Sequence, residues 1–199
     1  TAVMSKNKRE GIDFFPLVVD YEEKFYAAGA ILGSRFMRRE GRPSDEAILG
    51  GRVVDRTIRP LFEKHIRNEM QVIITILSID KDDPDVLAVN AASLALATSD
   101  ISWGGPVSAV RIGKQGGDDT LIVNPSYDTR EKEDVELDTV VCGKDGNINM
   151  IEVGAREILE DTMASVLTKA SEEIEKLQEF QKKIVKEIGK AKIEIPKNE

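Results

Sequence analysis

The run QVIITILSI at 71–79 is continuous, apolar and largely β-branched, and it limits what the chain around it can become. Such a run is typical of a strand that is buried on both faces. A strand of this kind has to be covered by helices or by a second sheet. The flanking residues must therefore supply those covering elements.

Helices are predicted on both sides of this strand. Before it, Ser44 is a favourable N-cap, the two acids that follow it suit the positive end of a helix dipole, and Pro60 stops the helix at about Arg59. After it, the acidic turn at 82–85 leads into a helix of small residues, VLAVNAASLALAT. The central strand is thus expected to lie against at least two helices.

Strand pairs and one long helical stretch account for most of the remainder. FFPLVVDYEE at 14–23 is predicted to be a strand, and two hairpins follow later: VSAVRIG with TLIVNP, and LDTVVCG with INMIEVG. The last fifty residues repeat apolar side chains at three- and four-residue spacing, which predicts helix. Strands and helices interleaved with antiparallel hairpins indicate an α+β fold class rather than a doubly wound parallel sheet.

The charge is unevenly distributed along the chain. A net charge of −8 argues against a general nucleic-acid binder, because phosphate contacts need lysine and arginine. The segment 35–59, however, holds seven arginines against four acids and no lysine, a local balance of +3. Arginine suits phosphate because its planar guanidinium donates paired hydrogen bonds. The segment therefore predicts a focused anion-binding site in an otherwise acidic protein.

Three of these arginines share one side of the helix after Ser44. At about 100° per residue, Arg52, Arg56 and Arg59 fall within one narrow sector. Apolar residues cover most of the remaining circumference: Leu49, Val53, Val54 and Ile58. Since a helix of this kind is largely buried, the arginines are expected to line a cleft. They equally suit structural salt bridges at a domain or subunit seam, and Asp55 is spaced to pair with Arg59.

The loop before this helix mixes aromatic, apolar and cationic side chains. Phe36 offers a ring on which bases can stack and Met37 adds a soft apolar side chain, while Arg38, Arg39 and Arg42 can pair with phosphates. That combination serves single-stranded RNA. Taken alone, the loop could as well be a hinge that buries one aromatic ring. The loop and the arginine side of the helix together form our candidate RNA-binding site.

The segment GSRFMRREGRPSDEAILGGRVVDRTIRPLF closely resembles the first RNase PH-type domain of the polynucleotide phosphorylase family. The likeness continues to VVCG and covers nearly the whole chain to about residue 160. It implies an RNase PH-like fold, with mixed sheets packed against helices in ribosomal-protein-type β-α-β elements. It also implies that Phe36, Met37, Arg38 and Arg39 narrow the RNA channel of a trimeric ring. Met37 replaces a second Phe of the family pattern, and Arg35 is a one-residue insertion.

The resemblance also implies a division of the chain. We expect 1–155 to be the first RNase PH-like domain, entered after its earliest strands. We expect 156–199 to be the C-terminal helical segment of that domain, leading toward a helical linker. The resemblance implies that the linker, a second catalytic domain and C-terminal RNA-binding modules of the family lie outside this sequence.

The same resemblance implies that this domain is not catalytic. Active domains hold phosphate on a Ser- or Thr-rich turn at a helix N-terminus. Here that turn is Asp-Pro-Asp at 83–85, whose carboxylates repel an anion and whose proline lacks an N–H. Active domains also carry two aspartates and a lysine; Asp138 keeps one aspartate position, while Lys132 and Val140 replace the other two residues. We therefore expect no catalytic residue and no metal ligand.

Other chemistries find little support. His65 is the only histidine, and its basic neighbours indicate a solvated surface position. Cys142 is the only cysteine and falls in a predicted buried strand, which excludes an internal disulfide and fits a reducing cytoplasm. Trp103 is expected to be a packing residue. No apolar run approaches the roughly 18 residues of a membrane span, and the start lacks the apolar region of a signal peptide.

Taken together, the residues and the resemblance predict a part of an enzyme. The family degrades RNA from its 3′ end by phosphorolysis and releases nucleoside diphosphates. Inorganic phosphate is the co-substrate, and Mg²⁺ is expected in the absent second domain. This chain would guide single-stranded RNA and build a homotrimer in the cytoplasm, without a membrane. The alternatives are a stand-alone phosphorolytic exoribonuclease and a purely structural subunit without RNA contact.

Overall fold

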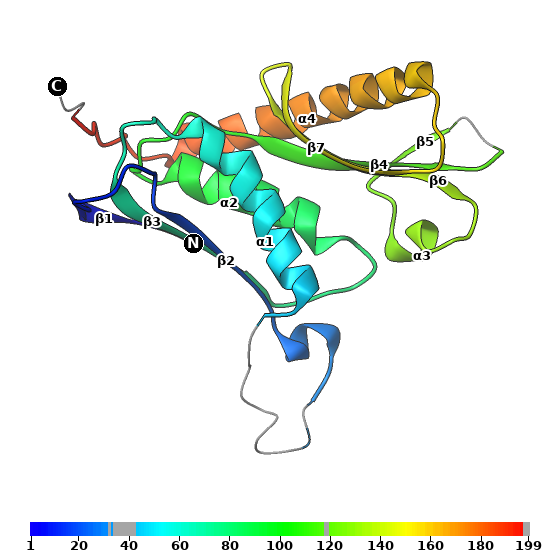
Figure 1. The fold of residues 1–199 in the computed structure, drawn as a ribbon, viewed down its shortest axis with the longest axis horizontal. Coiled ribbons are helices and arrows are strands. Elements are labelled where there is room, and N and C mark those ends of the chain that lie inside the picture. Colours follow the sequence, from blue (N-terminus) through cyan, green and yellow to red (C-terminus); the bar gives the residue numbers. More distant parts are fainter. Residues whose placement is uncertain (32, 34–42, 118–119, 197–199) are drawn as a thin grey trace.

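We analyse a computed structural model, which describes residues 1–31, 33, 43–117 and 120–196. Two β-sheets and the main helices form alternating layers (Figure 1). Sheet A has the strand order β1 (Ala2–Lys8), β3 (Asn68–Ile76), β2 (Leu17–Glu23). Sheet B has the order β5 (Leu121–Val123), β4 (Ser108–Gln115), β6 (Val135–Lys144), β7 (Asn147–Ala155). The α+β class and the mixed sheets agree with the prediction.

Sheet A is mixed because β3 pairs with β1 antiparallel and with β2 parallel. A parallel pair needs a crossover connection, and helix α1 (Asp45–Ile58) lies in it. Along β3 burial alternates: Val72 is fully buried under the helices, whereas Ile73 on the other face is 36% exposed. The prediction of a strand buried on both faces is therefore wrong at this position.

Helix α1 begins where the sequence predicts. The Ser44 hydroxyl accepts a hydrogen bond from the Ala47 N–H at 3.1 Å and caps the helix. Its inner face, which includes Val54 and Ile58, packs against sheet A and the neighbouring helix α2 (Pro84–Thr98). Leu49 points outward and is 58% exposed. The expectation of a helix that is apolar over most of its surface and largely buried is therefore wrong.

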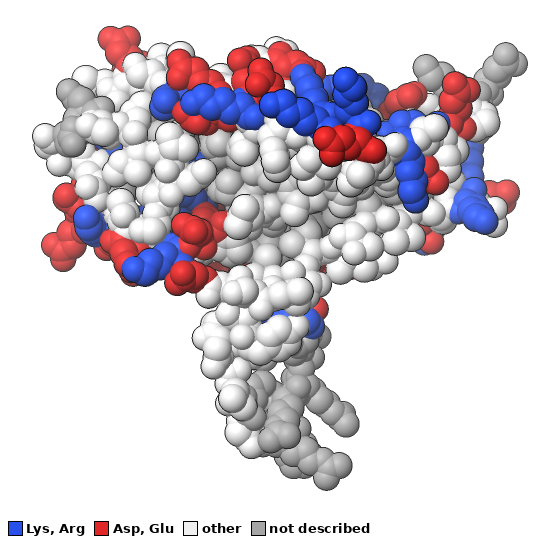
Figure 2. Space-filling model, turned by 180° about the vertical axis from the view of Figure 1, so that it is seen from behind, with Lys and Arg blue, Asp and Glu red and all other residues white. Residues whose placement is uncertain are grey.

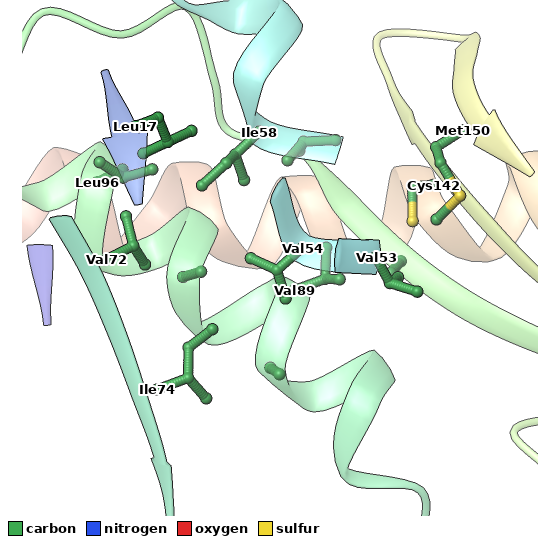
Figure 3. Packing of buried hydrophobic residues seen from close by; sticks show 14 of the residues in the cluster. Leu17, Val53, Val54, Ile58, Val72, Ile74, Val89, Leu96, Cys142 and Met150 are labelled. Atoms are coloured by element: carbon green, nitrogen blue, oxygen red, sulfur yellow. The ribbon is translucent and has the colours of Figure 1, made fainter. Parts of the chain in front are cut away.

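Helix α2 (Pro84–Thr98) fills the middle of the molecule, between the two sheets. Its small residues let it contact strands on both sides, so that Val89 and Leu96 are fully buried. Figure 3 shows side chains from α1, α2 and sheet A meeting there, with Cys142 and Met150 of sheet B nearby. Trp103 is also buried and donates from Nε1 to the Ile58 carbonyl at 3.1 Å, so its predicted packing role is confirmed.

Sheet B is covered on its other face by the long helix α4 (Glu160–Ile188). Strand β4 is buried on both faces, since Ala109 faces the α2 layer and Val110 and Ile112 face α4. The two predicted hairpins, β4 with β5 and β6 with β7, are both present. Three short helices complete the described fold: η1 (Phe25–Ala28), η2 (Arg59–Leu61) and α3 (Tyr127–Arg130).

The sequence predicts helix over the last fifty residues, but the C-terminal stretch is not helical to its end. Helix α4 stops at Ile188, and residues 189–196 run back along the C-terminal end of α2 as an extended strap. The Ile193 N–H donates to the Asp100 carbonyl at 2.8 Å. The Lys192 ammonium donates to three carbonyls at the end of α2, at 2.7–2.9 Å: those of Leu96, Ala97 and Ser99.

Candidate functional site

Only part of the predicted RNA-binding site can be placed. The loop residues Phe36, Met37, Arg38, Arg39 and Arg42 lie outside the described residues. The helix arginines Arg52, Arg56 and Arg59 are described, on α1. Their geometry decides which of them have side chains available for a ligand.

Arg59 is engaged in the fold. Its guanidinium pairs with both oxygens of Asp55, at 2.6 and 3.0 Å, which confirms the predicted ion pair. It also donates to the carbonyls of Phe15 and Leu17, at 3.0 and 3.1 Å. These bonds tie the end of α1 to the start of β2. They favour the structural alternative for Arg59 over a role in ligand binding.

Arg52 and Arg56 are different, because both are exposed and form no ion pair with any residue that the structure describes. Arg52 lines a groove of about 670 Å³ between α1 and β2, together with Asp55 and Arg59. Arg56 is not among the residues that line this groove, and its positive charge instead lowers the pKa of the Cys142 thiol on strand β6, as a minor effect beside burial. Their shared sector on the helix predicts that the three arginines line one cleft, but only Arg52 and Arg59 line this groove.

The long helix α4 also carries basic side chains, but acidic side chains lie among them. Figure 2 shows basic and acidic side chains intermixed along the upper edge of the molecule, where α4 lies. Lys169 and Lys176 both pair with Glu173, at 3.0 and 2.8 Å. Lys182 of the same helix pairs with Asp145 at 2.8 Å. Because acids neutralise these three lysines, this edge is less suited to a phosphate backbone than exposed arginines without partners are.

A network of two arginines and two aspartates, which sequence reasoning did not find, closes the corner at the N-terminus of α2. Arg111 donates from Nη1 to both oxygens of Asp138 at 2.9 Å, and its Nη2 contacts Asp83. Arg130 donates from Nε to Asp138 at 3.0 Å and from Nη1 to Asp83 at 3.1 Å. Each guanidinium thus bridges both carboxylates. We call these four residues the ion-pair network.

The ion-pair network is shielded from water. The side chains of Asp83 and Arg111 are only 7% and 10% exposed. Burial lowers the pKa of Arg111, but the carboxylates of Asp83 and Asp138 outweigh it, so the pKa lies above its ordinary value. The pKa of the neighbouring Asp85 is raised, first by burial and then by the charge of Asp83. The arginines are therefore held charged by the aspartates that they contact.

These residues do not fit a metal ion. Both oxygens of Asp138 already accept hydrogen bonds from guanidinium groups. Lys132 is exposed and Val140 is buried, so neither supplies a ligand at this corner. Among the described residues, no group of three or more His, Cys, Asp and Glu side chains could hold a metal.

Two further predicted positions have different outcomes. Cys142 is fully buried, as predicted, and burial raises the pKa of its thiol to about 12. His65 is only partly exposed, at 24% of its side chain, and contacts the strap, whereas the sequence predicted a solvated surface position. Its Nε2 lies 3.1 Å from the Ile195 carbonyl of the strap, and its Nδ1 lies 3.3 Å from Glu63. In the described parts of the chain, no helix combines the length and the apolar character that crossing a membrane requires.

Comparison with protein families gives two adjoining matches. Residues 1–102 match the family described as "3′ exoribonuclease family, domain 1". Residues 105–173 match "3′ exoribonuclease family, domain 2". The two matches meet between α2 and β4, at the connection from the sheet A layers to sheet B. The predicted boundary between 155 and 156 instead separates the C-terminal helical segment from the rest of the chain, and it stays a prediction.

Relatives and solved structures agree with these matches. The chain is 50% identical to a polyribonucleotide nucleotidyltransferase of Syntrophomonas wolfei and 48% identical to one of Caldicellulosiruptor bescii. The matches cover 98% and 99% of this chain but 28% of each relative. Rice (Oryza sativa) Rrp46 has a similar fold, with a TM-score of 0.73 at 12% identity, covering 93% of this chain and 82% of Rrp46. A chain of the Archaeoglobus fulgidus exosome with RNA bound to the active site has a TM-score of 0.66 at 19% identity, covering 90% and 76%.

Proposed function

The chain belongs to the 3′ exoribonuclease family, and on that premise we propose that it is the RNA-guiding, non-catalytic part of a polyribonucleotide nucleotidyltransferase. It spans 28% of the length of the relatives that carry this name, so the activity of the whole protein belongs to the proposal. The whole protein would degrade RNA from the 3′ end. Inorganic phosphate would attack the terminal phosphodiester, and a nucleoside diphosphate would leave.

The ion-pair network is the observation that carries the non-catalytic role. An attacking phosphate needs free donors, and a metal ion needs free carboxylate oxygens. At this corner Arg111 and Arg130 are already bound to carboxylates, and Asp83 and Asp138 are already bound to guanidinium groups. Phosphate and Mg²⁺ would therefore be bound by the second catalytic domain of the whole protein, and this domain would supply no reacting group.

The RNA-guiding role is supported by the residues on either side of Ser44. The loop with Phe36, Met37, Arg38, Arg39 and Arg42 offers stacking and phosphate contacts to single-stranded RNA. Behind it, Arg52 and Arg56 are exposed and lack ion-pair partners among the described residues. We propose that a cytoplasmic homotrimer brings three copies of this loop together around one RNA strand.

The double substitution Arg38→Ala/Arg39→Ala tests the RNA-guiding role in the full-length protein. Each single-strand phosphate contact that is lost should reduce the slope of log K against log salt by about 0.7. We expect weaker binding of a single-stranded RNA, measured by fluorescence anisotropy at several salt concentrations. Arg9→Ala is the matched control, because Arg9 is an exposed arginine paired with Glu69 at the edge of sheet A. Unchanged affinity and slope in the double variant would favour the purely structural alternative.

A further inference from the structure

Two adjacent aromatic residues of the short helix η1 are exposed. Phe25 is 48% exposed and Tyr26 is 58% exposed. The uncharged surface continues through Ala28 and Ile31, which are exposed as well. Figure 2 shows the projection that holds η1, at the bottom of the molecule, as mostly uncharged surface. A contiguous exposed patch of this kind, unlike a single exposed ring, is typical of an interaction site.

The backbone that carries the two rings is anchored to sheet A. The Lys24 N–H donates to the Ile76 carbonyl, the last residue of β3, at 3.2 Å. The Ile79 N–H donates to the Ala27 carbonyl at 2.9 Å, and Ala27 is buried. Because η1 is held in place before a ligand arrives, binding a flat ligand on its rings costs little ordering of the protein.

Phe25 also lines a hollow of about 300 Å³ at the foot of the loop that we propose to bind RNA. Ala30 and Pro43, which lie on either side of that loop, line the hollow as well. Its charged lining consists of two acids and one lysine: Glu22, Glu23 and Lys24. The lysine pairs with one of the acids at 2.8 Å. This balance of charge repels a phosphate, whereas an uncharged nucleobase can enter and stack on the ring.

We propose that Phe25 and Tyr26 form a stacking platform for the bases of single-stranded RNA. The inference rests on the proposed RNA-guiding role and adds to it a contact outside the loop. Arginines of the proposed site would pair with phosphates, while the platform contacts the faces of bases. Since every base has such a face, the platform holds RNA without a sequence preference.

The double substitution Phe25→Leu/Tyr26→Leu tests the platform in the full-length protein, because leucine keeps apolar bulk and removes the aromatic face. Phe14→Leu is the matched control, since Phe14 is a 59% exposed ring that precedes the opposite end of β2. Phe25→Tyr/Tyr26→Phe is the conservative variant, which keeps two rings. Binding of a single-stranded RNA is measured by fluorescence anisotropy at several salt concentrations. Sedimentation velocity reports the assembly state of each variant.

The double leucine variant should bind RNA at least about five-fold more weakly than the native protein, which corresponds to the loss of one stacked base. Because no phosphate contact is lost, the slope of log K against log salt should not change. The matched control and the conservative variant should bind as the native protein does. In Tyr26→Trp, a stacked base should quench the fluorescence of the new indole. The native protein, whose Trp103 is buried, gives the background.

Unchanged RNA binding by the double leucine variant overturns the inference. A loss of affinity together with a changed assembly state also overturns it, because the rings would then hold protein chains together. Arg38→Ala/Arg39→Ala, measured in parallel, separates this failure from failure of the proposed function. If only the arginine variant binds more weakly, the platform is excluded and the RNA-guiding role stands. If neither variant differs from the native protein, both are excluded.

Discussion

At the scale of single residues, the arginines of this chain have separate roles. The Arg59 guanidinium donates hydrogen bonds to Asp55 and to two backbone carbonyls. Arg52, on the same helix, is exposed. Arg111 and Arg130 bind carboxylates. Only exposed arginines without partners are free to meet RNA phosphates. We therefore propose that RNA contacts residues before and along α1, and not α2.

Arg59→Met should destabilise the fold. The change leaves the carbonyls of Phe15 and Leu17 and the Asp55 carboxylate without their donor. Because the arginine side chain is 40% exposed, water replaces part of this loss, and we expect about 1–2 kcal/mol. Arg52→Met is the control and should stay within roughly 0.5 kcal/mol. Urea denaturation measures both, and equal stabilities would contradict a structural role for Arg59.

The buried thiol of Cys142 should make the stability of the fold depend on pH. Burial raises the pKa of its thiol from 9.0 to about 12 in the folded protein, while the unfolded chain keeps the ordinary value. Below pH 9 the thiol is protonated in both states and has no effect. Between about pH 9 and 12 only the unfolded state loses the proton, so stability falls by about 1.4 kcal/mol per pH unit. Urea denaturation from pH 8 to 10.5 should show a shallower fall for Cys142→Ala, and identical slopes would contradict the burial.

Residue-scale prediction from sequence succeeds where the partners are close in the chain. Asp55 and Arg59 are one helical turn apart, and their pairing is foreseeable from that spacing. Arg111 meets Asp83 and Asp138 only because β4, β6 and α2 converge. Nothing local in the sequence indicates those contacts, and the acidic run near Asp134 suggests only a solvated loop. The ion-pair network was missed for this reason.

At the scale of elements, some helix ends depend on residues nearby in the chain and others on residues far away in it. The start of α1 depends on Ser44 and its own first turn, and the sequence predicts it correctly. The end of α2 depends on the strap at 189–196, which lies far away in the chain. Strand β3 is a further example, because Ile73 is apolar yet lies on the face that no described helix covers. Hydrophobicity alone cannot tell which face of a strand another element will cover.

Lys192→Met tests the strap. The ammonium satisfies three carbonyls that end α2 and lies at the negative end of its dipole. Burial lowers the pKa of Lys192, so the interaction is made against a desolvation cost. We expect a loss of about 1–2 kcal/mol, together with faster amide exchange at the C-terminal turn of α2. Lys183→Met, an exposed lysine on α4, serves as the control. An unchanged exchange rate would mean that the strap does not stabilise this turn.

At the scale of the whole molecule, the layers separate two regions. The RNA-facing residues that we propose precede and follow Ser44, at the end of sheet A and α1. The corner at which the resemblance predicts the phosphate turn of active domains lies between α2 and sheet B, and salt bridges occupy it. The family and its fold could be predicted from a long motif, since such motifs reflect the whole architecture. The placement of the salt bridges needed the coordinates.

The measurement that tests the central claim most directly is phosphorolysis by this chain alone. The purified chain is incubated with single-stranded RNA, inorganic phosphate and Mg²⁺, and nucleoside diphosphates are quantified by chromatography. The full-length enzyme is the positive control, and a reaction without phosphate gives the background. We predict no release above that background, because both guanidinium groups of the ion-pair network are bound to carboxylates and both oxygens of Asp138 accept hydrogen bonds from them. Phosphate-dependent release of nucleoside diphosphates by this chain would contradict the account.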